Sequence, residues 1–194
     1  MNLIKLSSDL IRFKSITPNS AGSLEFIQKI LKKNKFNCHL LEFGNKKIKN
    51  LYAEIKGGDG PNLCFAGHTD VVPAGNLKDW TSNPFKPTIK NGVLYGRGAS
   101  DMKTAIAAFI YSSLEFLSNC KNKFNGSLSF LLTADEEGEA DFGTKSMVNW
   151  LKRNHHKIDL CLVGEPTNPN YLGEMIKVGR RGSLNGEIIV KGIQ

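Results

Sequence analysis

The chain has 194 residues, with 26 Lys or Arg against 18 Asp or Glu, a formal net charge of +8 and a hydrophobic content of 40% that is typical of a globular protein. It contains no apolar run of about 18 residues and no secretory signal pattern, so we expect a cytoplasmic protein without a transmembrane helix. The lysines are spread along the chain without a nucleic-acid-reading motif. The charge therefore predicts a solvated surface, with neither a nucleic-acid nor a membrane partner.

The first third of the chain predicts two helices followed by strands. Apolar residues recur at helical spacing between Leu3 and Phe13, and Ser23 can cap a second helix that carries Ile27 and Leu31 on its apolar face. After Phe36 the pattern changes to that of strands. We expect these strands over residues 38–43, 51–55 and 62–66.

The middle of the chain predicts a long loop and then alternating strands and helices. The loop covers residues 73–92, where Pro, Asn, Gly and Lys are frequent. This alternation predicts an α/β fold with a mixed, largely parallel sheet flanked by helices. Cys64 and Cys161 lie inside apolar strands, so both are expected to be buried and unpaired. The remaining predicted strands are 93–95, 127–132, 158–163 and 183–193, and the predicted helices are 105–117 and 144–152.

Four clusters of acidic residues and histidine each follow a predicted strand. They are Gly67-His68-Thr69-Asp70, Gly96 to Asp101, Thr133 to Gly138, and Gly164-Glu165-Pro166-Thr167. Ligands of open α/β sheets bind beyond the carboxyl ends of the strands, so we expect these clusters to surround one crevice. The side chains concerned are His68, Asp70, Asp101, Glu136, Glu137 and Glu165.

So many carboxylates around one imidazole predict a divalent metal site. Like charges raise one another's pKa, and a metal cation supplies the compensating charge through the oxygen and nitrogen ligands that zinc accepts. Asp70 follows His68 by two residues in an extended segment, so its carboxylate could fix the imidazole tautomer. Glu136 and Glu137 are adjacent and point differently, which suits one for metal binding and the other for proton transfer. Each cluster alone also has an ordinary structural explanation, and their joint placement favours the metal site.

In this order the motifs resemble those of the dinuclear zinc aminoacylase and carboxypeptidase family. The resemblance covers essentially the whole chain, through residues 67–75, 94–103, 133–138, 164–167 and 176–186. It implies a zinc-exopeptidase-like catalytic domain that hydrolyses an amide bond with two divalent metal ions, zinc or else cobalt. It also implies a cis peptide bond after Asp101.

The resemblance assigns a role to each candidate side chain. His68 would bind one metal ion, Asp101 would bridge both, and Glu165 would complete the first site. Glu137 would bind the second metal ion. The two residues expected to act beside the metal ions are Glu136, as general base and acid, and Asp70, which would orient His68.

The run at residues 176–186 is most similar to family members that remove a succinyl group from an acidic diamino compound. We expect Arg180 and Arg181 to pair with carboxylates of such a small-molecule substrate. The alternatives are an acetylornithine deacetylase or carboxypeptidase of the same family, and an inactive truncated remnant.

The resemblance also predicts the domain organisation. Residues 1–178 would be the amino-terminal portion of a catalytic domain, and residues 179–194 the start of a lid and dimerisation domain. Two further histidines of the family pattern have no counterpart here. We therefore expect an amino-terminal half that is weakly active or inactive alone, and a homodimer in the full-length enzyme.

Overall fold

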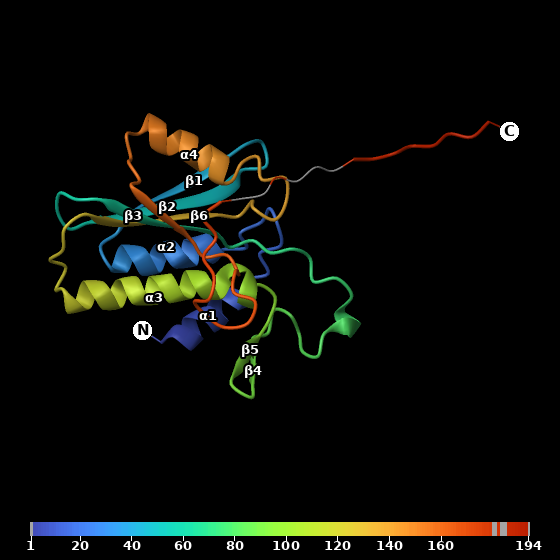
Figure 1. Ribbon diagram of the computed structural model, residues 1–194, viewed down its shortest axis with the longest axis horizontal. Coiled ribbons are helices and arrows are strands. Elements are labelled where there is room, and N and C mark those ends of the chain that lie inside the picture. The colour runs from blue at the N-terminus through green and yellow to red at the C-terminus, as the bar shows by residue number, and fades with distance from the viewer. Residues whose placement is uncertain (1, 180–181, 183–185, 194) are drawn as a thin grey trace.

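A computed structural model describes residues 2–179, 182 and 186–193, and within them the protein forms three layers. A five-stranded sheet lies between three helices on one face and a single helix on the other (Figure 1). The described elements are α1 (Leu3–Arg12), α2 (Ser23–Lys33), β1 (Asn37–Phe43), β2 (Ile48–Lys56), β3 (Asn62–His68), β4 (Thr88–Lys90), β5 (Val93–Tyr95), α3 (Thr104–Asn119), β6 (Ser127–Thr133), α4 (Thr144–Arg153) and β7 (Leu160–Val163).

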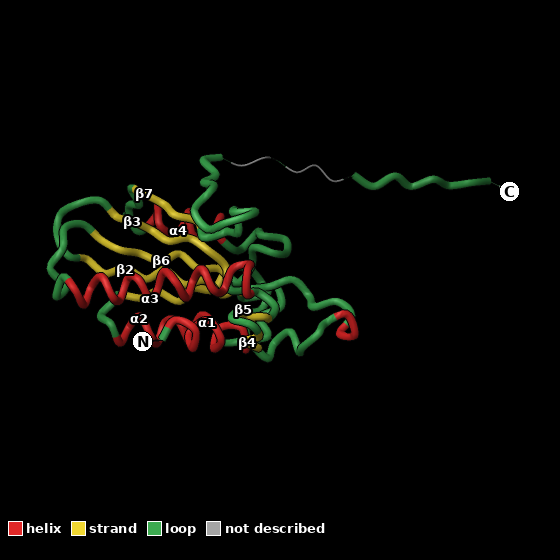
Figure 2. Tube along the Cα trace, turned by 60° about the horizontal axis from the view of Figure 1, so that its bottom comes forward, coloured by secondary structure: helices red, strands yellow, loops and turns green. Residues whose placement is uncertain are grey.

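The sheet has the strand order β1-β2-β6-β3-β7. Strand β2 is antiparallel to both β1 and β6, whereas β3 is parallel to β6 and to β7. All strands of this sheet except β2 therefore run in one direction, which confirms the predicted mixed, largely parallel sheet. Figure 2 shows β7 beside β3 at the edge of the sheet, with the β4–β5 hairpin apart from it.

Both faces of the sheet are covered by apolar helix faces. On one face Leu10 of α1, Ile27 of α2 and Ile106 of α3 are fully buried in a cluster with Phe130 of β6. On the other face Met147 of α4 belongs to a smaller cluster over β2, β3 and β6. The apolar residues that recur at helical spacing in α1, α2 and α3 thus lie on the faces that pack into the larger core.

The expectations for residues 73–92 and for Cys161 differ from the structure. The segment 73–92 is not a plain loop, because it contains a short 3₁₀ helix, Leu77–Asp79, and the strand β4. Cys64 is buried as expected, but Cys161 is exposed because β7 is the outermost strand of the sheet. An apolar run indicates a strand, but it does not tell whether that strand lies at the centre or at the edge.

The carboxyl-terminal residues 186–193 have no assigned helix or strand and extend away from the sheet (Figure 1). The predicted strand at 183–193 therefore has no partner among the described residues. No helix in the described part of the chain is both long and apolar enough to cross a membrane.

Candidate metal centre

The topology brings the carboxyl ends of β3, β6 and β7 to one edge of the sheet. His68 is the last residue of β3 and lies opposite Thr133 of β6, two residues before Asp135. Strand β7 ends at Val163, opposite Ala66, so Glu165 follows at the same edge. Asp101 reaches this edge from the turn before α3, and its peptide bond to Met102 is cis, as expected.

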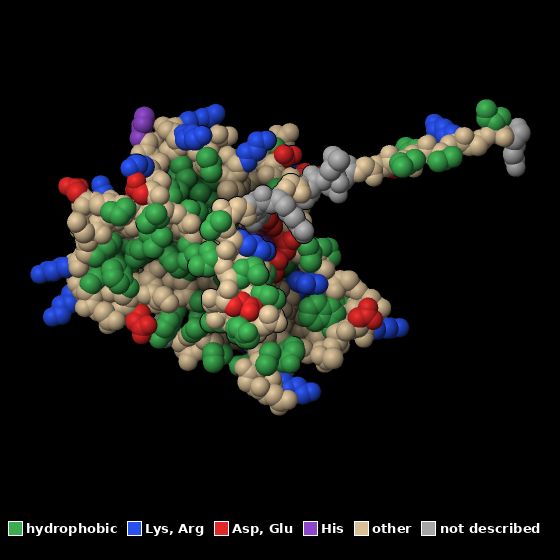
Figure 3. All heavy atoms as spheres, in the orientation of Figure 1, with side chains coloured by type: hydrophobic (Ala, Val, Ile, Leu, Met, Phe, Trp, Pro, Cys, Tyr) green, Lys and Arg blue, Asp and Glu red, His purple; other side chains and the backbone are tan. Residues whose placement is uncertain are grey.

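These strand ends form what we call the acidic recess, defined by His68 and four carboxylates. Figure 3 shows acidic side chains gathered in a hollow near the middle of the visible face. Two groups of described residues could hold a metal ion there, and within each group the ligand atoms lie within 4.8 Å of one another. The groups are His68, Asp101 and Glu137, and His68, Glu136 and Glu165.

The imidazole of His68 is 1% exposed and has two different neighbourhoods. Its Nδ1 donates a hydrogen bond to the main-chain carbonyl of Asp70 at 2.9 Å. Its Nε2 lies 3.0 Å from Asp101 Oδ1 and 3.3 Å from Glu165 Oε1. With the proton held on Nδ1, the lone pair of Nε2 points at the carboxylates, as a metal ligand requires.

Two buried atoms in the recess fit a cation better than a hydrogen bond. Among the described residues, His68 Nε2 and Asp101 Oδ1 are buried without a hydrogen-bond partner, although they face each other. Leaving such atoms unpaired is costly, whereas both are ordinary ligands of zinc and related divalent ions. The donor set therefore fits the metal ions that the sequence predicts. The division of ligands between two ions stays a prediction.

The pKa values of His68 and of three carboxyl groups in the recess are raised, which is consistent with a site for a cation. Burial by itself lowers the pKa of His68, but the carboxylates of Glu165 and Asp70 outweigh it and raise the pKa to about 9. Burial raises the pKa of Asp101, with a further contribution from Glu165. Burial likewise raises the pKa of both Glu136 and Glu137. Burial therefore disfavours the charged form of these carboxyl groups, and a bound cation would offset that penalty.

Asp70 contacts the His68 imidazole N–H, but by a hydrogen bond to its main-chain carbonyl and not to its carboxylate. Its carboxylate Oδ1 lies 3.6 Å from His68 Nδ1, so the ring is held by the Asp70 carbonyl instead. The other oxygen, Oδ2, accepts hydrogen bonds from the main-chain N–H groups of Glu136 and Glu137, each at 3.1 Å. Asp70 thus contacts the segment of the two glutamates directly.

Lys103 is a residue near the site that sequence reasoning missed. Its side chain is fully buried, and Nζ donates to the carbonyl of Phe13 at 2.7 Å. Burial lowers the pKa of Lys103 to about 8, while the charge of Asp70 acts in the opposite direction. A lysine at the start of the apolar helix α3, directly after Asp101-Met102, was the available signal.

Arg97 and Trp80 connect the long loop to the turn that precedes Asp101. The Arg97 guanidinium lies 5.1 Å from the centroid of the Trp80 ring, within cation–π range. Trp80 Nε1 donates to the carbonyl of Ala74 at 2.8 Å. These contacts connect residues 74–80 with the turn that leads to Asp101.

The structure does not place the predicted substrate-binding arginines. Arg180 and Arg181 lie outside the described residues. His39 and His156 lie away from the recess, against Tyr52 and Trp150 on the α4 face of the sheet, which agrees with their position outside the sequence motifs.

The chain belongs to Peptidase family M20/M25/M40, whose sequence profile matches residues 64–187. Among curated relatives, it is 52% identical over 191 residues to the succinyl-diaminopimelate desuccinylase of Wolbachia pipientis wMel, covering 98% of this chain and 47% of that protein. It is 55% identical over 196 residues to the protein of the same name from Pelagibacter ubique (strain HTCC1062), covering 100% of this chain and 50% of that protein. The chain thus spans about half the length of these relatives.

Solved structures support the fold independently. An M20 family metallo-carboxypeptidase from Sulfolobus solfataricus superposes with a TM-score of 0.71 at 23% identity, over 84% of this chain and 37% of that one. Human carnosine dipeptidase 1 superposes with a TM-score of 0.70 at 21% identity, over 83% of this chain and 37% of that one. At these identities the likeness concerns the fold alone.

Proposed function

We propose that the whole protein is a metal-dependent amide hydrolase that removes the succinyl group from N-succinyl-LL-2,6-diaminopimelate. The observation that carries the hydrolase assignment is the convergence of His68 Nε2 with Asp101 and Glu165 in the acidic recess. Of these groups, His68 Nε2 and Asp101 Oδ1 are buried without a hydrogen-bond partner. The names of the relatives at 52% and 55% identity support the substrate. The reaction adds water across the amide bond and gives succinate and LL-2,6-diaminopimelate.

In this proposal each side chain of the recess has one task. Two divalent ions, zinc or else cobalt, would be held by His68, Asp101, Glu137 and Glu165, and would polarise the amide carbonyl and acidify the attacking water. Glu136 accepts the proton of that water and delivers it to the leaving amine. The Asp70 carbonyl keeps the proton of His68 on Nδ1.

Three further parts of the proposal concern the protein beyond the recess. Arg180 and Arg181 would bind the acidic substrate through its carboxylates. The protein would act in the cytoplasm as a homodimer. Residues 1–178 would belong to the catalytic domain and residues 179–194 to the start of the lid.

The test compares this chain with the same reading frame continued to its natural stop. We expect two metal ions per chain and hydrolysis of succinyl-diaminopimelate in the longer form, and weak or no turnover in the 194-residue form. Equal or faster turnover of acetylornithine would replace the substrate assignment with a deacetylase. A frame that stops at codon 194, together with absent metal binding and turnover, would identify an inactive remnant.

A further inference from the structure

The loop at residues 134–143, between β6 and α4, carries both glutamates of the acidic recess and is folded around one buried carboxylate. Asp135 is 3% exposed. Its Oδ1 accepts a hydrogen bond from the main-chain N–H of Ala140 at 3.2 Å, and its Oδ2 accepts one from the N–H of Phe142 at 3.0 Å. One side chain thus closes the loop on both of its oxygens.

The opposite end of the same loop is held from outside. Asp70 Oδ2 accepts the N–H groups of Glu136 and Glu137, and Thr133 Oγ1 accepts the N–H of Asp135 at 3.0 Å. Glu136 and Glu137 therefore lie between two buried carboxylates, each bonded to main-chain N–H groups. Hydrogen bonds from N–H groups to a carboxylate are among the stronger kinds, so these anchors fix where the two side chains begin.

The loop is tightly packed at its two glycines. A Cβ added at Gly143 would come within 2.3 Å of the Asp135 carbonyl oxygen, and one at Gly138 within 2.9 Å of Thr17 Oγ1. Asn50 Nδ2 also donates to the Phe142 carbonyl at 3.0 Å. The chain thus passes as close to Asp135 as sterics allow.

Asp135 does not belong to either candidate metal group, and both of its oxygens are bonded to the main chain. We propose that Asp135 is a positioning residue, which sets the direction of Glu136 and Glu137 by gathering the N–H groups of Ala140 and Phe142. For its effect on turnover this inference rests on the proposed hydrolase function. For the loop itself it rests on the geometry alone.

The decisive variants are Asp135→Asn and Asp135→Ala in the whole protein. The amide of Asp135→Asn keeps one acceptor oxygen and sets an NH₂ group against the other N–H, whereas Asp135→Ala removes both acceptors. The matched control is Asp141→Asn, which removes the same charge from an exposed residue of the same loop. Circular dichroism establishes that each variant is folded, and Asp135→Asn is the variant used if Asp135→Ala is not.

We expect kcat of Asp135→Asn to fall about 10- to 100-fold with KM within twofold, since small misplacement of a catalytic group costs about that much. Asp141→Asn should match the wild type. Amide hydrogen exchange supplies the second readout, with exchange at Ala140 and Phe142 at least tenfold faster in Asp135→Asn and unchanged in Asp141→Asn.

Two results would overturn the inference. One is exchange at Ala140 and Phe142 that is unchanged in both Asp135 variants. The other is faster exchange with kcat preserved. If the wild type hydrolyses no acylated substrate, the proposed function fails alone, and zinc titration then decides the positioning role. An affinity for zinc at least tenfold lower in Asp135→Asn supports it, and an unchanged affinity overturns it.

Discussion

His68 is shared by both candidate metal groups, and its ring is fixed by a main-chain carbonyl. A carbonyl accepts a hydrogen bond but carries no proton of its own, so Nδ1 carries a proton and Nε2 faces Asp101 and Glu165. The metal-binding capacity of the recess should therefore depend on this residue more than on any single carboxylate.

Replacing His68 by alanine should lower the affinity for zinc at least 100-fold, because both groups lose their only nitrogen ligand. Zinc titration of the apoprotein with a competing chelator measures the effect. His155→Ala is the control, since His155 is exposed and lies after α4. Stoichiometric zinc binding of unchanged affinity in His68→Ala would place the metal site elsewhere.

Glu136→Gln tests whether Glu136 transfers protons or binds metal, since the structure also places it in one of the two groups. As the general base, it should lower kcat about 100- to 10,000-fold when replaced, with metal content unchanged. The two measurements are steady-state hydrolysis and metal analysis of the same preparation. Loss of one metal ion per chain would instead make Glu136 a ligand. Asp141→Asn again serves as the matched charge control.

The identity of the recess residues could be predicted from the sequence, but their hydrogen bonds could not. The pattern of apolar runs in the sequence locates the strand ends and turns at which His68, Asp101 and Glu165 lie. The contacts of Asp70 and Asp135 are with main-chain N–H groups of residues 136–142. Every residue but proline offers such a group, so no sequence letter marks the partner, and only the path of the loop decides it.

At the scale of elements, the sequence predicts where the helices and strands lie better than it predicts which strands pair and in which direction. The runs that became β2, β3 and β6 are recognisable, but nothing in β2 indicates that it runs against the rest of the sheet. Its direction follows from the turn at residues 44–47 that joins it to β1. Cys161 was wrongly predicted to be buried for a related reason, since edge and centre positions depend on the strand order.

Two histidines pack against aromatic rings on the face of the sheet that α4 covers. The His39 and His156 rings lie 5.8 Å apart, and His156 stacks on Trp150. Burial lowers the pKa of His39, the charge of His156 lowers it further, and Glu54 opposes both. Protonating His39 is therefore harder in the folded chain than in the unfolded one.

This shift predicts a loss of stability in acid. Because the folded pKa of His39 lies below its unfolded value near 6.5, the unfolded chain binds the proton first, and stability falls as the pH drops below about 6.5. We expect the wild-type urea midpoint to fall relative to that of His39→Gln between pH 7.5 and pH 5.5. His68, whose raised pKa acts in the opposite direction, titrates equally in both proteins. His155→Gln, at an exposed position, should retain the wild-type decrease. An equal decrease in His39→Gln would assign the acid sensitivity to other groups.

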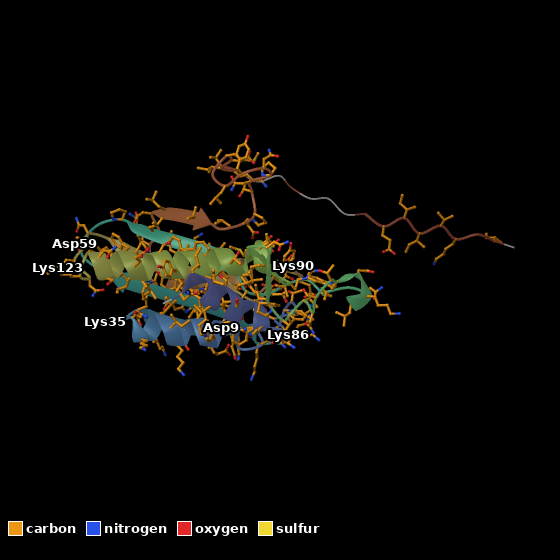
Figure 4. The ribbon with its side chains drawn as sticks, turned by 90° about the horizontal axis from the view of Figure 1, so that it is seen from below. Asp9, Lys35, Asp59, Lys86, Lys90 and Lys123 are labelled. Atoms are coloured by element: carbon orange, nitrogen blue, oxygen red, sulfur yellow. The ribbon has the colours of Figure 1, made fainter. Side chains whose placement is uncertain are left out.

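The whole molecule is basic, yet its candidate site is acidic. In Figure 4 Lys35 and Lys123 lie with Asp59 at the left of the view, and Lys86 and Lys90 lie apart from them, nearer the middle. The positive charge is therefore dispersed over the described surface, as expected for solvated lysines. The negative charge of the recess is instead concentrated where β3, β6 and β7 end.

Metal binding should stabilise the whole fold, because the ligands come from separate segments that meet only in the folded chain. A ligand at 100 times its Kd stabilises the native state by about 2.7 kcal/mol. We expect a chelator to lower Tm and added zinc to restore it. In His68→Ala the chelator should have little effect. A wild-type Tm that is independent of zinc would show that the folded chain binds zinc no more tightly than the unfolded chain.

Because Glu165 follows β7, metal binding depends on the register in which β7 pairs with β3. Only four residue pairs fix β7 on β3, and β7 has no strand on its outer side among the described residues. A slip by two residues would preserve the inward and outward faces of β7 and nearly all of the sheet. It would also carry Glu165 about 6.6 Å along the strand and out of reach of His68. Molecules with β7 shifted by two residues would thus have a normal circular dichroism spectrum but would have lost their affinity for zinc. A zinc titration can therefore measure the fraction of molecules in which β7 is correctly paired with β3.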